Sequence, residues 1–252
     1  MSKISEEKAG SDFVKESLEP LKRRSFLKYS GLGVAASAAL LIGCEDSLLS
    51  PGRDGKASAN GRTAEDDEAV DLGSGDIGIL NYAYALEQLE AAFYTAVVAQ
   101  EGFSGRFTQE EKEILMDLKA HEVIHREFLK AALGEMAIQD LTPNFSAIDF
   151  SSKESVLNTA KVFEDLGVAA YNGAGKLIVD VNYLLVAGKI VSDEARHASA
   201  IRDVLNPLSM DFAGDDVIDE NGFDKALMPM DVLAAAQPFI MEKINGSNLP
   251  TA

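Results

Sequence analysis

A twice-repeated arrangement of glutamate and histidine is the feature that most constrains the fold of this chain. Each repeat is a lone glutamate followed by a Glu-x-x-His pair: Glu87, Glu122 and His125, then Glu164, Glu194 and His197. Residues three apart lie on one face of a helix, so each pair can direct a carboxylate and an imidazole at one point. The lone glutamates are 77 residues apart and the pairs 72, which predicts two helical hairpins of one design.

The four glutamates lie on helix faces that also carry Ala, Leu, Ile and Tyr, and such faces point into a protein core. A carboxylate there costs several kcal/mol unless a cation or strong hydrogen bonds compensate its charge. Four carboxylates with two imidazoles suit a dinuclear iron or manganese centre inside a four-helix bundle. The pattern therefore predicts a metal site rather than solvated surface glutamates.

The identity of the first glutamate is open, because Glu90 lies one helical turn after Glu87. Glu87 is preferred, since it has a tyrosine seven residues later, Tyr94, as Glu164 has Tyr171. The two tyrosines either donate hydrogen bonds to ligating carboxylates or are ordinary core aromatic residues.

Start and stop signals place the helices of the first hairpin. Asp76 is expected to cap the first helix, which ends near Gly102. A capping box from Thr108 to Glu111 begins the second helix, and Gly134 ends it.

The second hairpin has similar signals. A capping box over residues 151–154 begins the third helix, a break is expected near Asp180, and Asn206 with the following proline ends the fourth helix. The glycines at 173 and 175 serve either close helix contact or an earlier end of the third helix. Residues 135–150, between the hairpins, are long enough for a crossover along the bundle.

Two stretches carry a family resemblance, residues 80–94 (LNYAYALEQLEAAFY) and 194–202 (EARHASAIR). The chain resembles ferritin-like, carboxylate-bridged dimetal proteins and, among them, exported ferritin-like domains related to desiccation-associated proteins. The resemblance spans roughly Ile77 to Leu205. It implies an all-α, ferritin-like four-helix bundle with one long crossover. A short C-terminal helix, from Pro229 to about Lys243, is expected to pack on the bundle.

The resemblance also implies a ligand set for two iron or two manganese ions. In it, Glu122 and Glu194 bridge the two ions. Glu87 with His125 completes one end of the site, and Glu164 with His197 completes the other. The sequence does not choose between iron and manganese.

The N-terminal region reads as export and anchoring signals. Arg23 and Arg24 precede a mildly apolar segment, as in a twin-arginine signal, and Cys44 ends a stretch that resembles a lipoprotein cleavage site. The alternative is a basic cytoplasmic tail on a short buried helix. The expected organisation is a signal peptide over 1–43, a lipidated flexible tether over 44–75, the bundle over 76–206, and a C-terminal loop and helix over 207–252.

Charge and cysteine content limit the kinds of binding partner and metal site that this chain can have. The chain has 23 basic and 41 acidic residues, a net charge of −18, which repels nucleic acid and anionic lipid, so membrane contact is expected only through the lipid anchor. Cys44 is the one cysteine, which excludes a rubredoxin-type Cys-x-x-Cys site. Electrons for an iron centre would then come from an external donor.

The protein is expected to act in the cell envelope, where its dimetal centre would react with H₂O₂ or O₂ in oxidative-stress defence. A non-catalytic, metal-stabilised envelope module is the alternative. His121 also completes a His-Glu-x-x-His motif, which is typical of zinc proteases, but that interpretation leaves Glu194 and His197 unexplained. The sequence leaves the oligomeric state open, although a lipid anchor conflicts with a closed 24-subunit cage.

Replacing Cys44 with alanine is expected to release the protein from membranes, because the lipid would lose its point of attachment. Membrane and soluble fractions of cells that express each form provide the measurement. Retention of the variant in the membrane fraction, with residues 1–43 intact, would contradict the lipoprotein hypothesis.

Overall fold

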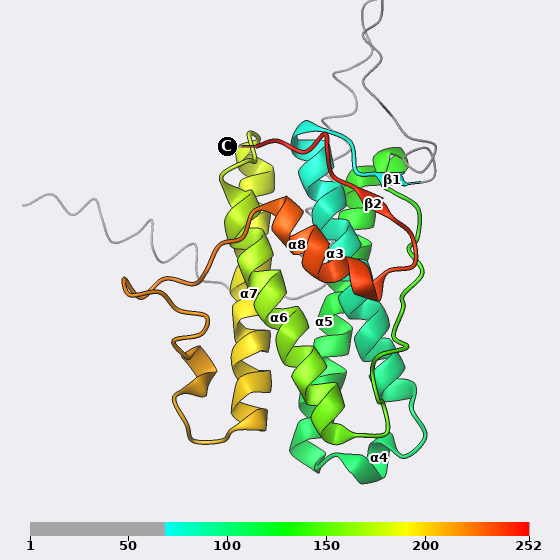
Figure 1. The fold of residues 1–252 in the computed structure, drawn as a ribbon, viewed down its shortest axis with the longest axis vertical. Helices are drawn as coiled ribbons and strands as arrows, with labels where there is room; N and C mark the ends of the chain where they lie inside the picture. The colour runs from blue at the N-terminus through cyan, green and yellow to red at the C-terminus, as the bar shows by residue number, and fades with distance from the viewer. Residues whose placement is uncertain (1–68, 252) are drawn as a thin grey trace, which may run out of the picture. The chain divides into compact units, whose positions relative to one another are not determined.

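Four long helices form a bundle in a computed structural model that describes residues 69–251 (Figure 1). They are α3 (Gly75–Ala99), α5 (Gln109–Leu133), α6 (Lys153–Gly175) and α7 (Val181–Leu205). α3 packs against α5, and α6 packs against α7, so the chain forms the two predicted hairpins. The predicted all-α four-helix bundle is confirmed. The expectations for Arg23, Arg24 and Cys44 fall outside the described residues.

A long crossover joins the hairpins. α5 ends at Leu133 and continues into a short 3-10 turn (Gly134–Met136), whereas α6 begins near the start of α5, where Lys153 donates to Glu111 at 2.5 Å. The connecting segment therefore runs along the length of the bundle (Figure 1). Within residues 69–251, no helix is both long and apolar enough to span a membrane.

Helix capping agrees with the sequence at the start of α5. The Thr108 hydroxyl accepts the Glu111 N–H at 3.2 Å, and the Glu111 carboxylate accepts the Thr108 N–H at 2.8 Å. α3 ends slightly earlier than expected, at Ala99. Gly102, with φ of 83°, then begins a single turn of helix, α4 (Phe103–Arg106). This positive φ lies in the left-handed region of backbone conformation, which glycine adopts without strain.

Two predicted caps were wrong. Ser152 caps α6 and not Ser151, because the Asp149 carboxylate takes both the N–H and the hydroxyl of Ser151 in a turn of its own. Asp76 does not cap α3 either. It lies inside the first turn of α3 and accepts the N–H groups of Val179 and Asp180 at 2.8 and 2.7 Å, which fastens the two hairpins together at one end of the bundle.

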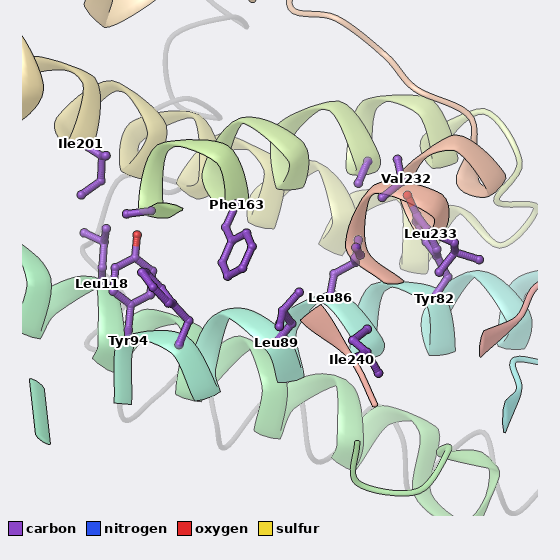
Figure 2. Close-up of a cluster of buried hydrophobic side chains, with 14 of the residues drawn as sticks. Tyr82, Leu86, Leu89, Tyr94, Leu118, Phe163, Ile201, Val232, Leu233 and Ile240 are labelled. Carbon is purple, nitrogen blue, oxygen red and sulfur yellow. The ribbon is translucent and has the colours of Figure 1, made fainter. Parts of the chain in front are cut away.

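The C-terminal segment covers one face of the bundle. Helix α8 (Pro229–Ala236) packs on α6, and Figure 2 shows Val232 and Leu233 in one apolar cluster with Tyr82 and Phe163. α8 is shorter than predicted, because Pro238 disfavours a continuing helix and the chain turns through a 3-10 turn (Gln237–Phe239).

Two short strands close the fold. β1 (Val70–Asp71) and β2 (Ile244–Asn245) pair in parallel and join the start of the described chain to its end. Between α7 and α8, a loop with a short 3-10 turn (Asp211–Ala213) is held by Arg202, which is almost fully buried on α7. Arg202 forms paired hydrogen bonds of 2.7–2.9 Å with Asp165 on α6 and with Asp216 in the loop.

Gly173 allows the segment before α8 to lie directly on α6. The Leu227 N–H donates to the Ala169 carbonyl, and a Cβ on Gly173 would lie 1.7 Å from the Leu227 carbonyl oxygen. Gly173 therefore does serve a close contact, but with this segment and not with another helix. Gly175 is the last residue of α6, as the alternative prediction had it.

Gly173→Ala is expected to lower the free energy of unfolding by about 1–3 kcal/mol, because the new methyl group would push the Leu227 segment off the bundle. Gly188 is the matched control: it lies inside α7, and no atom is within 4 Å of its hypothetical Cβ. Gly188→Ala should stabilise the protein by up to about 1 kcal/mol through helix propensity alone. Urea unfolding of both variants gives the comparison; equal effects of the two would refute this role of Gly173.

Candidate metal centre

All four predicted glutamates are fully buried and converge at mid-height in the bundle. One comes from each long helix: Glu87 from α3, Glu122 from α5, Glu164 from α6 and Glu194 from α7. With the two histidines they form two groups whose ligand atoms lie within 4.8 Å of one another. The first group is Glu87, Glu122, His125 and Glu194, and the second is Glu122, Glu164, Glu194 and His197.

His125 is at the centre of the first group. Its Nδ1 lies 3.4 Å from Glu87 Oε2, 3.4 Å from Glu122 Oε2 and 3.2 Å from Glu194 Oε1. Donor atoms bound to one ion at about 2.1 Å are roughly 3.0–3.4 Å apart in octahedral or tetrahedral geometry, so this spacing suits a first-row divalent metal ion.

His197 has the same position in the second group. Its Nδ1 lies 2.8 Å from Glu122 Oε1 and 3.4 Å from Glu164 Oε2. The two carboxylate oxygens of Glu122 thus face different histidines, Oε1 toward His197 and Oε2 toward His125. Together with the membership of Glu194 in both groups, this is the placement that a carboxylate shared by two ions requires.

The two tyrosines contact the lone glutamates reciprocally. Tyr94 on α3 donates to Glu164 on α6 at 2.5 Å, and Tyr171 on α6 donates to Glu87 on α3 at 2.6 Å. Of the two interpretations open from the sequence, the hydrogen-bonding one describes this arrangement. Each bond fixes the Oε1 of a glutamate and leaves its Oε2 directed at a histidine.

Unpaired polar atoms gather at this site. Nine buried side-chain nitrogen or oxygen atoms among the described residues lack a hydrogen-bond partner, and eight of them belong to the six predicted ligands. The short distances from His125 and His197 to carboxylates are therefore close approaches without hydrogen-bond geometry. Buried polar atoms without partners are costly, and a cation placed among them would satisfy them. The donor set and its unpaired atoms fit metal ions.

Without a cation, protons must balance the buried charge. Burial raises the pKa of Glu122 to about 7 in spite of the nearby histidines, and burial with repulsion from Glu122 raises the pKa of Glu194 well above its usual value. Burial by itself lowers the pKa of His197, but Glu122 and Glu164 outweigh it and raise that pKa to about 11. A divalent cation would replace protons at this site.

Glu90 is also buried, but it belongs to neither group. It lies three residues after Glu87, and the equivalent position after Glu164 is Gly167. A Cβ on Gly167 would lie 3.2 Å from Glu90 Oε1 and 3.0 Å from Glu194 Oε2. The glycine therefore makes room for a fifth carboxylate. The geometry favours Glu87 over Glu90 as the ligand candidate.

The zinc-protease interpretation requires His121 and His125 to face one ion, and no group of candidate ligands among the described residues contains both. His121 instead lies outside the buried groups, beside His197 and Asp193. Sequence reasoning missed Asp193. The available signal was its position directly before Glu194, which matches that of His121 directly before Glu122.

Comparison with known proteins gives one match. A family model described as a ferritin-like domain matches residues 75–207, which include α3, α5, α6, α7 and all six predicted ligands. No curated protein matches the chain. The narrower resemblance to exported, desiccation-associated proteins stays a prediction.

The metal-free protein is expected to lose stability as the pH rises from about 4.5 to about 7. A glutamate in the unfolded chain titrates near 4.5, so above that pH the folded state retains a proton on Glu122 that the unfolded state has released. This one group should lower the free energy of unfolding by up to ~3 kcal/mol across the window, and the raised pKa of Glu194 acts in the same direction. The raised pKa of His197 adds a further loss of stability only above about pH 6.5, where a histidine in the unfolded chain loses its proton. Glu87, whose pKa is lowered against the effect of burial by contact with His125, acts only at lower pH.

Urea unfolding in the presence of a chelator at pH 5 and pH 7.5 measures this dependence. Glu122→Gln, which is neutral at both values, is the control and should show a smaller loss. A wild-type stability that is equal at both pH values would contradict the expectation.

Proposed function

The chain belongs to the ferritin-like domain family, and we propose that its bundle holds two iron or two manganese ions that react with H₂O₂ or O₂. The observation that carries the proposal is the pair of buried ligand groups that share Glu122 and Glu194. Export and lipid anchoring through Cys44 would put this chemistry in the bacterial cell envelope, as part of oxidative-stress defence.

The proposed ligand roles follow the two groups. Glu122 and Glu194 would bridge the ions, because both belong to each group. Glu87 with His125 would complete one end, and Glu164 with His197 the other. Tyr171 and Tyr94 would hold the terminal glutamates in place through their hydrogen bonds of 2.6 and 2.5 Å.

Two redox-active ions held by these residues would supply the electrons that reduce peroxide or O₂. The protein's own part is to hold the donor atoms with little movement and to keep bulk water away from them. The four glutamates are fully buried, and Leu118, Phe163 and Ile201 belong to the apolar cluster of the same bundle (Figure 2). Such a surrounding strengthens electrostatic interaction between carboxylate and ion.

Electron supply separates the two metals. Reduction of one H₂O₂ to two H₂O consumes two electrons and two protons. A second H₂O₂ can provide both when it is oxidised to O₂, which is the reaction expected with manganese. With iron, an external donor would return the electrons, since the chain has a single cysteine and no rubredoxin-type site.

A non-catalytic role is the second candidate, and the buried charge is the observation that favours it. Metal ions that neutralise four buried carboxylates would stabilise the bundle even without turnover. Turnover of peroxide by fully loaded protein separates the two functions.

Protein loaded with Mn²⁺ or Fe²⁺ should hold about two ions per chain, and Glu122→Ala or Glu194→Ala should lose most of both, because each removes a shared ligand. The manganese form should release O₂ steadily from H₂O₂. The iron form should be oxidised once and then stop until a reductant is added. Glu164→Ala, which keeps both bridges, should abolish either reaction.

The control is Glu127→Ala, which removes an exposed carboxylate from α5 that pairs with Arg126 outside the ligand groups. It should keep both ions and full activity. Two bound ions without any reaction with H₂O₂ or O₂ would leave the structural role as the function.

A further inference from the structure

A third group of possible ligands lies just outside the buried centre. It consists of His121 on α5 with Asp193 and His197 on α7. The side chains of His121 and Asp193 are 25 % and 24 % exposed, whereas that of Glu122 is 0 % exposed. The group therefore lies between solvent and the buried carboxylates. The proposed function uses His197 Nδ1 but assigns no role to His121, to Asp193 or to His197 Nε2.

The three donor atoms have the spacing of a metal site. His121 Nδ1 lies 2.9 Å from His197 Nε2 and 3.6 Å from Asp193 Oδ2, and the last two atoms are 3.7 Å apart. Such a triangle fits a circle of radius about 2.0 Å, close to the 2.0–2.2 Å bonds that divalent zinc or cobalt makes with imidazole and carboxylate. Solvent could complete the coordination sphere.

Asp193 is held in the orientation that this site needs. Arg196 donates to its Oδ1 at 2.6 Å, which leaves Oδ2 directed at the histidines. The exposed Asp117 carboxylate lies 3.9 Å from His121 Nε2 and adds negative charge on the solvent side. A cation that approaches from solvent would meet these carboxylates before the buried ones.

We propose that His121, Asp193 and the outer nitrogen of His197 form an uptake site, which binds a divalent first-row metal ion from solvent before the ion moves to the buried centre.

His197 supplies the reason for transfer. Its Nε2 belongs to the uptake site, and its Nδ1 faces Glu122 and Glu164 in the buried group. A neutral imidazole has one nitrogen lone pair and one N–H, so it ligates one ion at a time. An ion on Nδ1 leaves Nε2 as an N–H donor and removes the third ligand of the uptake site. Occupancy of the buried site at His197 therefore releases the outer ion.

The outer nitrogens of His125 and His197 have different neighbours at the two ends of the centre. Asp193 precedes Glu194 and lies 3.5 Å from His125 Nε2, so the far nitrogen of His125 faces a carboxylate that can accept its N–H. The equivalent residue before Glu122 is His121, which presents a ring nitrogen to His197 instead. The substitution of an imidazole for a carboxylate at this one position creates the outer site at the His197 end.

The equilibrium test uses Co²⁺ as the probe and does not depend on the proposed function. In the double variant Glu122→Gln/Glu194→Gln, which removes both shared ligands of the buried groups, one Co²⁺ per chain should still bind. The visible absorption of low-coordinate cobalt reports it. Addition of His121→Ala should weaken this binding at least ~10-fold, because one of three protein ligands is lost.

His125→Ala in the same double variant is the matched control. His125 is a ligand candidate of the buried centre but not of the uptake site, and it only neighbours Asp193, so Co²⁺ binding should change far less than with His121→Ala. Binding that depends on His125 and not on His121 would be residual binding in the buried groups, and it would overturn the proposal. Absence of Co²⁺ binding in the folded double variant would do the same and would leave the His121–His197 contact as a hydrogen bond.

The kinetic test keeps the buried ligands intact and rests on the proposed dimetal centre. Stopped-flow loading of metal-free protein with Co²⁺ should be about 10-fold slower in His121→Ala than in wild type, with the same final content. An unchanged loading rate would refute the uptake role. A wild type that binds one Co²⁺ through His121 but never two in the buried groups would refute the proposed function and leave the outer site intact.

Discussion

The burial of four carboxylates against two imidazoles is the constraint on which the rest of this structure depends. Glu122 and Glu194 are 0 % exposed, and burial raises the pKa of both. Without a cation, the bundle must therefore either bury their negative charge, which is unfavourable, or keep protons on these carboxyl groups. A fold tolerates this only if the surrounding helices are held firmly and if a cation can take the place of the protons. The Nδ1 atoms of His125 and His197, which have no hydrogen-bond partner, face these buried carboxylates.

Hydrogen bonds fasten the hairpins to each other both beside that charge and at one end of the bundle. Tyr94 and Tyr171 each donate a hydrogen bond to the lone glutamate of the opposite hairpin, and Asp76 accepts two N–H groups from the turn between α6 and α7. Arg202 fastens α7 to α6 and to the loop that follows. Contacts that hold the fold and contacts that orient ligand candidates are thus partly the same, and a change in one should affect the other.

Departures from the internal repeat identify where the surroundings of the two ligand groups differ. The residue equivalent to Glu90 in the second repeat is Gly167. Because this glycine has no side chain, it leaves room for the Glu90 carboxylate next to it. Asp193 has His121 as its equivalent, which gives the far nitrogens of His125 and His197 different partners. The candidate ligands are duplicated, but the residues around them are not. The two ends of the candidate centre are therefore chemically distinct. The outer His121 and Asp193 are also the most solvent-accessible members of the whole cluster.

The sequence was sufficient to predict the four long helices and the burial of four glutamates beside two histidines, because periodicity and Glu-x-x-His spacing are local properties of a helix. It missed the Ser152 cap, the role of Asp76 and the early end of α8, where local hydrogen bonds and Pro238 compete with simple start and stop signals. Three further features emerged only in the folded structure: Glu87 and not Glu90 lies within a group of candidate ligands, each tyrosine pairs with a glutamate, and Asp193 lies beside three histidines. These are distances between helices far apart in the chain, and no spacing along one helix specifies them.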